Sequence, residues 1–358
     1  MDEREMMVHG GDIYRKIIDI DFSVNINPLG MPERVKEALQ KALADCGRYP
    51  DIRAEKLRYA IEKMNGINKQ HVLCGNGASE LFLAIVHGIK PKKTMIPVPS
   101  FYGYEHAARA AGGEILFYEM KEETGFCLQP DFPEALEEEM DLLFLANPNN
   151  PVGNVINTGL LEEILRTCLE KDIAVVMDEC FLEFTGDDDE RSLKSQLKEY
   201  PNLIIVRSFT KIFAMPGVRL GYLFCGNQEM LEQIGNQLPE WNLSVLAQAA
   251  GIQACKETEY VKRTAGLVKR EREYMRDELE KAGIEVFPSE TDYLLIYSSL
   301  PLYEKLLEHK ILIRDCSNFR GMRKGFYRLA VKSHEENEML LHAVGKIEEA
   351  ARVRSKDE

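Results

Sequence analysis

The sequence lacks the cysteine and histidine spacings of a disulfide framework or a metal site. Its 8 cysteines include no Cys-x-x-Cys pair, and its 7 histidines form no ligand cluster. Scattered cysteines of this kind are typical of free thiols in a reducing cytosol. We therefore expect a cytoplasmic protein that holds neither disulfides nor a metal ion.

Long apolar runs and an excess of positive charge are also missing. The longest apolar stretch, residues 81–89, is far shorter than the ~18 residues of a membrane span, and residues 1–5 are mostly charged, unlike a signal peptide. Asp and Glu number 59 against 45 Lys and Arg, a formal net charge of −14. This charge repels nucleic acid and anionic lipid. We expect no nucleic-acid partner and no membrane, and any anionic ligand needs a local basic site.

Short apolar runs alternate with amphipathic stretches over the first two thirds of the chain. Runs such as Leu142–Leu145 and Ile173–Met177 are apolar throughout, which is typical of parallel strands covered on both faces. The alternation predicts a doubly wound α/β domain. The expected strands are His71–Cys74, Thr94–Val98, Glu114–Tyr118, Asp141–Ala146, Ile173–Asp178, Leu203–Arg207 and Leu220–Cys225, with helices Ser79–His87, Tyr102–Ala111 and Leu160–Leu169 among them.

The pattern changes after Trp241. One long charged helix is expected from Leu246 to about Lys281, and a terminal helix from His334. The strands expected between them are Tyr293–Tyr297, Ile311–Arg314 and Tyr327–Val331. We therefore divide the chain into an N-terminal arm (1–30) that packs with the small domain, a large domain (31–243) and a smaller α+β domain (244–358) that includes the linking helix.

A candidate nucleophile follows the strand Leu203–Arg207. Lys211 stands three residues after Ser208 and eight before Arg219, and the Met-Pro-Gly turn at 215–217 could bring Arg219 back toward Ser208. Ligands of open α/β sheets bind beyond the carboxyl ends of the strands. Nearby positive charge lowers the pKa of a lysine, and a deprotonated lysine can react with a carbonyl group.

This segment resembles the cofactor-binding lysine segment of fold-type I pyridoxal-phosphate enzymes, the aspartate aminotransferase superfamily. The shared pattern is Ser-x-x-Lys, a Pro-Gly turn and Arg-x-Gly-Tyr, here ending at Tyr222. The resemblance runs nearly from end to end. It implies a mostly parallel seven-stranded sheet in the large domain and pyridoxal phosphate as the cofactor. It also implies that Lys211 binds the cofactor covalently while Ser208 and Arg219 hold its phosphate.

Other motifs occur in the order of that superfamily. Asp178 ends a strand and, by resemblance, pairs with the pyridine nitrogen, so that the ring stays an electron acceptor. Asn150, in the segment 147–153, matches the residue that hydrogen-bonds the phenolic oxygen and helps to hold the substrate. The resemblance also places the N–H groups of Ala78 and Ser79 at a helix N-terminus, where they would bind the cofactor phosphate.

Three further residues have counterparts in the superfamily. Phe101 matches the aromatic residue that stacks on the cofactor ring. Tyr49, in Arg-Tyr-Pro-Asp at 48–51, matches a tyrosine that reaches the cofactor phosphate of the partner subunit, which predicts a homodimer with shared active sites. Arg328 matches the arginine that grips the substrate α-carboxylate, a task that suits a bidentate guanidinium.

Two subfamilies share this length and order of motifs: L-threonine-O-3-phosphate decarboxylase and histidinol-phosphate aminotransferase. Three stretches resemble the decarboxylase: His-Gly-Gly-Asp at 9–12 (which has Asn last in that family), Asp-Phe-Ser-Val-Asn-Ile-Asn-Pro-Leu-Gly at 21–30, and Arg314–Phe319. Phe181 stands where aminotransferases usually have tyrosine. The substrate-binding residues implied by the resemblance are His9, Gly30, Asn150, Arg314 and Arg328.

The expected activity is pyridoxal-phosphate-dependent decarboxylation of L-threonine O-3-phosphate to (R)-1-amino-2-propanol phosphate, for cobalamin biosynthesis. The alternative is an aminotransferase of the histidinol-phosphate type that transfers an amino group to 2-oxoglutarate. In both cases the partner is a small phosphorylated substrate. The acidic charge disfavours a third hypothesis, a DNA-binding regulator built on the same fold.

Overall fold

The larger part of the protein is built around one seven-stranded sheet. A computed structural model describes residues 10–357, with side chains to residue 351. The strand order is β2-β8-β7-β6-β5-β3-β4, and β8 runs antiparallel to both of its neighbours while the other pairs are parallel. The strands are β2 (Val72–Gly75), β3 (Lys93–Val98), β4 (Glu114–Glu119), β5 (Leu142–Ala146), β6 (Ala174–Asp178), β7 (Leu203–Ser208) and β8 (Gly221–Cys225).

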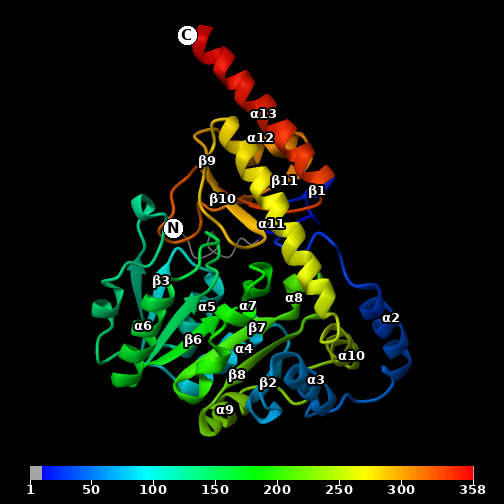
Figure 1. The fold of residues 1–358 in the computed structure, drawn as a ribbon, viewed down its shortest axis with the longest axis vertical. Helices are drawn as coiled ribbons and strands as arrows, with labels where there is room; N and C mark the ends of the chain where they lie inside the picture. The colour runs from blue at the N-terminus through cyan, green and yellow to red at the C-terminus, as the bar shows by residue number, and fades with distance from the viewer. Residues whose placement is uncertain (1–9, 358) are drawn as a thin grey trace.

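Helices flank this sheet (Figure 1). The central strands β5, β6 and β7 are buried along their whole length, as expected for strands covered on both faces. The predicted mostly parallel α/β sheet is therefore confirmed. The helices of this part are α2 (Glu33–Ala42), α3 (Glu55–Asn65), α4 (Ala78–Ile89), α5 (Tyr102–Ala111), α6 (Thr158–Glu170), α7 (Asp188–Arg191), α8 (Phe209–Ile212), α9 (Gln228–Gly235) and α10 (Val245–Ala254).

A smaller antiparallel sheet forms the upper part of Figure 1. Its order is β12-β13-β10-β9, from Arg314–Asp315, Phe326–Ala330, Tyr293–Tyr297 and Glu285–Val286. Helices α12 (Leu302–Glu308) and α13 (His334–Asp357) belong to this part, and α11 (Thr258–Lys281) joins it to the large sheet. The arm contributes Ile20 and Phe22 to the core of the small part, and β1 (Ile20–Asp21) pairs in parallel with β11 (Ile311–Leu312).

The single helix expected from Leu246 to Lys281 is wrong, because the chain breaks between α10 and α11. Helix α10 buries Ala250 and Ala254 in the core of the large sheet. Helix α11 ends in the other core, where it buries Met275 and Leu279. The break lets the chain turn from one core toward the other. Neither proline nor glycine marks it, so the helical pattern alone could not show it.

The strand expected over Ile311–Arg314 is also divided. Residues Ile311 and Leu312 pair with the arm, whereas Arg314 and Asp315 pair with β13. The chain changes its partner strand at Ile313, which is a tertiary effect that a run of apolar residues does not encode.

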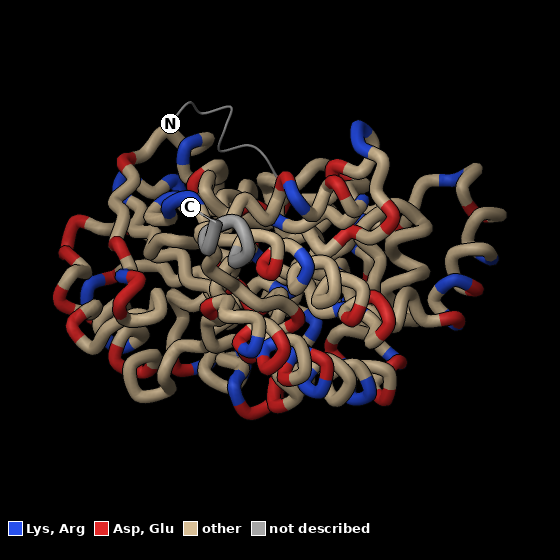
Figure 2. The backbone as a smooth tube through the Cα atoms, turned by 90° about the horizontal axis from the view of Figure 1, so that it is seen from above, with Lys and Arg blue, Asp and Glu red and all other residues tan. Residues whose placement is uncertain are grey.

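The topology brings several chain segments to one edge of the large sheet. Parallel strands β3, β5, β6 and β7 end there, and the antiparallel strand β8 begins there. Acidic and basic residues are intermixed over the rest of the molecule (Figure 2). None of the helices described is both long and apolar enough to cross a membrane.

Candidate active site

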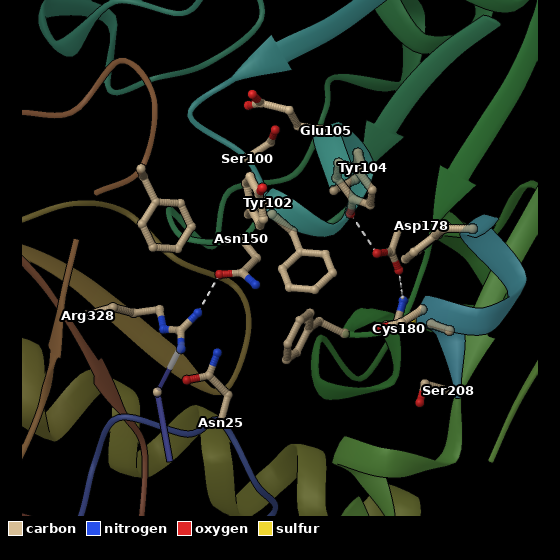
Figure 3. A pocket seen from close by; sticks show the side chains of 18 of the residues that line it. Asn25, Ser100, Tyr102, Tyr104, Glu105, Asn150, Asp178, Cys180, Ser208 and Arg328 are labelled. Carbon is tan, nitrogen blue, oxygen red and sulfur yellow. Dashed lines mark hydrogen bonds between the residues drawn. The ribbon is translucent and has the colours of Figure 1, made fainter. Parts of the chain in front are cut away.

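A cavity of about 250 Å³ lies at this edge, between the large sheet and the small one. Side chains from both sheets and from the arm line it (Figure 3). The structure brings together there most of the residues singled out in the sequence: Ala78, Ser79, Phe101, Asn150, Asp178, Ser208, Lys211, Arg219, Arg314 and Arg328.

Lys211 belongs to the single helical turn α8, which follows β7 directly. Ser208 caps this turn, since its Oγ accepts a hydrogen bond of 3.1 Å from the Thr210 N–H. Burial and the positive charges of Arg328 and Arg219 lower the pKa of the Lys211 ammonium to about 8. About a tenth of the amine is then uncharged at pH 7, far more than for an ordinary lysine.

Asp178 is the last residue of β6, and its carboxylate lies at the cavity wall. One oxygen accepts a hydrogen bond from the Tyr104 hydroxyl at 2.6 Å, and the other accepts one from the Cys180 N–H at 2.9 Å (Figure 3). Burial raises the pKa of Asp178, while the hydrogen bonds from Cys180 and Tyr104 act to lower it. The carboxyl is thus a proton acceptor held in a fixed place.

An anion site is formed where β2 leads into α4. Ala78 and Ser79 begin this helix, so their N–H groups have no partner inside it. These N–H groups form the positive end of the helix dipole, which attracts an anion. Gly77 has a φ of +82°, and a Cβ there would lie 2.6 Å from Nη2 of Arg219. Only glycine therefore lets the Arg219 guanidinium approach the loop this closely.

Arg328 reaches the cavity from β13 of the small sheet. Its Nη1 donates to Oδ1 of Asn150 and its Nη2 donates to the Ser23 carbonyl at 2.9 Å (Figure 3). Its Nε is buried and has no hydrogen-bond partner among the described residues. Asn25, also in the cavity wall, is 1% exposed, and its Oδ1 is unpartnered in the described part of the chain. Buried polar atoms of this kind are normally paired, which indicates a polar ligand at this place.

Arg314 stands directly opposite Arg328 in the antiparallel pair β12–β13. Both side chains line the cavity. Arg314 is held by hydrogen bonds to the Asp315 carbonyl at 2.6 Å and to Asn318 Oδ1 at 2.7 Å. Like charges opposite each other in a sheet are destabilising. The pair therefore indicates that the cavity receives an anionic ligand.

Three residues expected in the site are placed differently or not described. Gly30 is not part of the cavity wall, and its carbonyl accepts a hydrogen bond from the Tyr260 hydroxyl. Tyr49 is 77% exposed, and its ring packs at a tilt of 35° against Trp241 with the ring centres 4.8 Å apart. His9 lies outside the described residues.

The sequence interpretation missed Asn25, Tyr104 and Arg320, which all line the cavity. Asn25 lies inside the segment 21–30 that resembles the decarboxylase. This resemblance could have marked Asn25 as a site residue, but it could not show that Asn25 lines the cavity. Tyr104 sits on the buried face of α5 and is indistinguishable in sequence from a core residue. Arg320 lies in a loop of the small part and forms an ion pair of 2.9 Å with Glu105 of α5.

The cavity offers the groups that pyridoxal phosphate requires. It holds an amine of lowered pKa, a carboxylate for the ring nitrogen, an aromatic side chain for the ring face and an anion site at a helix N-terminus. Two buried polar atoms without partners mark the space for a bound ligand. Together with the sheet order, these groups define a pyridoxal-phosphate-dependent enzyme of fold type I.

Comparison with known proteins gives the family. Residues 17–345 match the family described as aminotransferase class I and II. The chain is 34% identical over 329 residues to the threonine-phosphate decarboxylase of Salmonella typhimurium, covering 91% of this chain and 90% of the relative. It is 35% identical over 305 residues to a histidinol-phosphate aminotransferase of Clostridium kluyveri, covering 84% of each. The chain therefore belongs to the aminotransferase class I and II family.

A solved structure agrees with this assignment. The histidinol-phosphate aminotransferase from Clostridium acetobutylicum superimposes with a TM-score of 0.87 at 33% identity, covering 92% of this chain and 99% of that one. The predictions of a fold-type I enzyme and of pyridoxal phosphate as its cofactor are confirmed. The enzyme is a decarboxylase or an aminotransferase, and relatives of both kinds have 34% to 35% sequence identity to it.

Proposed function

We propose that this protein decarboxylates L-threonine O-3-phosphate to (R)-1-amino-2-propanol phosphate, for cobalamin biosynthesis. The observation that carries the proposal is the pairing of Arg314 with Arg328 on neighbouring strands in the cavity wall. Threonine phosphate carries a carboxylate and a phosphate a few bonds apart. Two adjacent guanidinium groups suit such a substrate, since each can bind one anion through paired hydrogen bonds.

In this proposal the large sheet holds the cofactor. Ala78, Ser79, Ser208 and Arg219 would bind its phosphate, Asp178 its ring nitrogen, Asn150 its phenolic oxygen and Phe101 the face of its ring, with all seven residues in one cavity wall. When bound, pyridoxal phosphate supplies an electrophilic aldehyde and an electron-accepting ring. Lys211 would bind the aldehyde carbon covalently until the amino group of the substrate replaces it.

The small sheet and the arm orient the substrate. Arg328 is fixed by Asn150 and by the Ser23 carbonyl, so it would hold the substrate carboxylate in one position. Arg314 would bind the phosphate, and Asn25 has a free buried oxygen for the substrate amino group or a hydroxyl. Fixing both anions decides which bond at Cα is broken. Lys211, with its lowered pKa, would return a proton to Cα.

The alternative function is transamination of the histidinol-phosphate type. The same lysine would then remove the Cα proton, and the same arginines would bind a phosphate or the carboxylate of 2-oxoglutarate. The Clostridium kluyveri aminotransferase has 35% identity to the chain against 34% for the Salmonella typhimurium decarboxylase, over 84% and 91% of the chain. Phe181 argues for the decarboxylase, because it lies in the cavity wall and has no hydroxyl to offer the cofactor.

One pair of assays distinguishes the two functions. The purified holoenzyme is incubated with L-threonine O-3-phosphate, and separately with histidinol phosphate and 2-oxoglutarate. Release of carbon dioxide without glutamate is the expected result. Formation of glutamate in the second assay, with no carbon dioxide in the first, would replace the decarboxylase by the aminotransferase. Borohydride reduction followed by peptide mass analysis tests the cofactor attachment, with Lys211→Arg as the control.

We also propose that the enzyme is a cytoplasmic homodimer. Tyr49 and Trp241 form an exposed aromatic pair, and Ile52, which follows Tyr49 closely in sequence, is 51% exposed. Exposed apolar groups that lie together are typical of subunit interfaces. The 8 cysteines are all unpaired thiols, which suits a reducing compartment.

A further inference from the structure

Tyr104 contacts two groups that would face the cofactor ring. It lies on α5 and is 1% exposed. Its hydroxyl donates to Oδ2 of Asp178 at 2.6 Å (Figure 3). The edge of its ring meets the ring of Phe101, with the centres 5.6 Å apart and an interplanar angle of 83°. A single side chain thus connects the carboxylate at the ring nitrogen with the aromatic residue at the ring face.

The tyrosine ring is held rigidly by its neighbours. It stacks on Phe144 with an interplanar angle of 11° and a centre distance of 5.1 Å. Phe82 packs edge-on against it, also at 5.1 Å. Both contacts have the geometry that aromatic pairs prefer. The hydroxyl therefore has little freedom, and its direction toward Asp178 is set by packing rather than by the hydrogen bond alone.

The hydrogen bond opposes the effect of burial on Asp178. Removing a carboxylate from water favours its neutral form, which raises its pKa, while the donors Cys180 and Tyr104 lower it. Burial and the adjacent carboxylate raise the pKa of Tyr104 well above the ordinary value, so the phenol keeps its proton. Because a neutral phenol has only one proton, and that proton points at Asp178, Tyr104 acts as a permanent donor.

We propose that Tyr104 is a positioning residue that keeps Asp178 ionised and aimed at the ring nitrogen of the cofactor. The inference rests on the proposed role of Asp178, and it holds for decarboxylation and for transamination alike. Without the hydroxyl, the carboxylate binds a proton more tightly. With the cofactor bound, Asp178 would then draw a proton away from the ring nitrogen, and the ring would accept electrons less strongly.

The test uses Tyr104→Phe, which removes one oxygen and keeps the ring packing. The enzyme is loaded with pyridoxal phosphate labelled with ¹⁵N in the ring, and the nitrogen signal is recorded by NMR. The expected result is a shift toward the unprotonated position, with turnover reduced at least about tenfold because a hydrogen bond to a charged group is lost. Tyr118→Phe is the matched control, since Tyr118 donates to Asp131 at 3.3 Å outside the cavity wall.

A second substitution covers the case in which Tyr104→Phe does not fold. Difluorotyrosine at position 104 has almost the shape of tyrosine but is a stronger donor, so the nitrogen signal should shift toward the protonated position. A signal that stays at the wild-type value in both variants would overturn the proposal. Asp178→Asn tests the role of Asp178 separately from that of Tyr104. If only Asp178→Asn changes the nitrogen signal, Asp178 contacts the ring nitrogen as proposed, but Tyr104 does not position it. If it leaves the signal unchanged, the proposed role of Asp178 is itself wrong.

Discussion

At the residue scale, the cavity works by placing positive charges in a protein that is acidic as a whole. The net charge is −14, yet Lys211, Arg219, Arg314 and Arg328 line one cavity of about 250 Å³. The arginines cannot lose their protons at any working pH. Burial lowers the pKa of the Lys211 ammonium to about 8, and the charges of Arg328 and Arg219 add to this effect. Arg328 and Arg219 thus both attract an anionic substrate and, together with burial, favour the uncharged amine.

Arg314→Gln tests the proposed phosphate site. The substitution removes a charged donor but keeps a polar side chain. We expect KM for L-threonine O-3-phosphate to rise about 10- to 100-fold, because charge-assisted hydrogen bonds to the phosphate are lost. Steady-state kinetics of carbon dioxide release measure the effect. Arg276→Gln, at an exposed arginine of α11 that pairs with Asp277, is the control. An unchanged KM in Arg314→Gln would remove this residue from the substrate site.

At the element scale, Asn27 joins three segments of the chain. Its N–H donates to the Lys211 carbonyl at 3.2 Å. Its side-chain amide donates to the Ile212 carbonyl at 2.6 Å and to the Thr264 hydroxyl at 2.7 Å. The residue is 2% exposed. The arm, the turn that carries Lys211 and the linking helix α11 are thus fastened together at one buried point.

Asn27→Ala should destabilise the protein and loosen the cofactor site. The Ile212 carbonyl would lose a buried partner, which costs about 1–3 kcal/mol. We expect a lower urea midpoint and faster loss of bound pyridoxal phosphate on dialysis. Asn236→Ala, at an exposed position at the end of α9, should change neither. A wild-type midpoint for Asn27→Ala would show that the arm is not held through this residue.

A second element-scale feature is the ionic cluster beside the active site. Arg207 is 2% exposed and lies 2.8 Å from Glu179 and 3.7 Å from Glu183. Burial raises the pKa of Glu183 to about 7, even though Arg207 acts to lower it. Glu179 and Arg207 are the neighbours of Asp178 and Ser208 in sequence, so the cluster connects the ends of β6 and β7.

The free energy of unfolding should therefore fall as the pH rises through the range in which Glu183 loses its proton. A carboxyl group whose pKa is higher in the folded state binds its proton more tightly when folded. Its contribution to the free energy of unfolding is complete below the pKa of the unfolded state, near 4.5. This contribution is lost as the pH rises through the pKa of the folded state, about 7. The loss is about 3 kcal/mol at most.

Denaturant unfolding between pH 5 and pH 8 measures this dependence. We expect Glu183→Gln to flatten the profile, because the neutral amide has no proton to lose. The exposed residue Glu259 provides the matched control, Glu259→Gln, which should keep the wild-type slope. Identical slopes in Glu183→Gln and the wild type would assign the pH dependence to other groups.

At the scale of the whole molecule, the proposed dimer places one tyrosine of each chain in the site of the other. Tyr49 is exposed in the single chain and does not line its own cavity. Tyr49→Ala and Lys211→Ala should each be nearly inactive. Mixed and refolded together, they should recover about a quarter of the wild-type activity, because half of the dimers are hybrids with one intact site.

Analytical ultracentrifugation of the wild-type enzyme, run beside the mixing experiment with the two variants, measures the oligomeric state directly. Trp241→Ala, which removes the ring beside Tyr49, should weaken the dimer and make activity depend on protein concentration. A mixture of Tyr49→Ala and Lys211→Ala that stays inactive, although hybrids form, would show that the sites are not shared.

The sequence by itself determined the sheet and the chemistry of the site. Fully apolar runs such as Leu142–Leu145 have few stable places other than the centre of a covered sheet. Residues that follow such strands, among them Asp178 and Lys211, reach the same edge whatever the details of packing. Local patterns and the family resemblance together therefore predicted most of the side chains that line the cavity, although Gly30 and Tyr49 lie elsewhere.

Only the tertiary structure decided what lies across the cavity and behind its wall. The opposition of Arg314 and Arg328 depends on the register of two strands, and the role of Asn27 on the packing of the arm against α11. In the sequence Tyr104 resembles an ordinary core residue, and only the structure shows that its hydroxyl donates to Asp178. Contacts between distant segments arise from how the two cores pack, and no local pattern of residues encodes that packing.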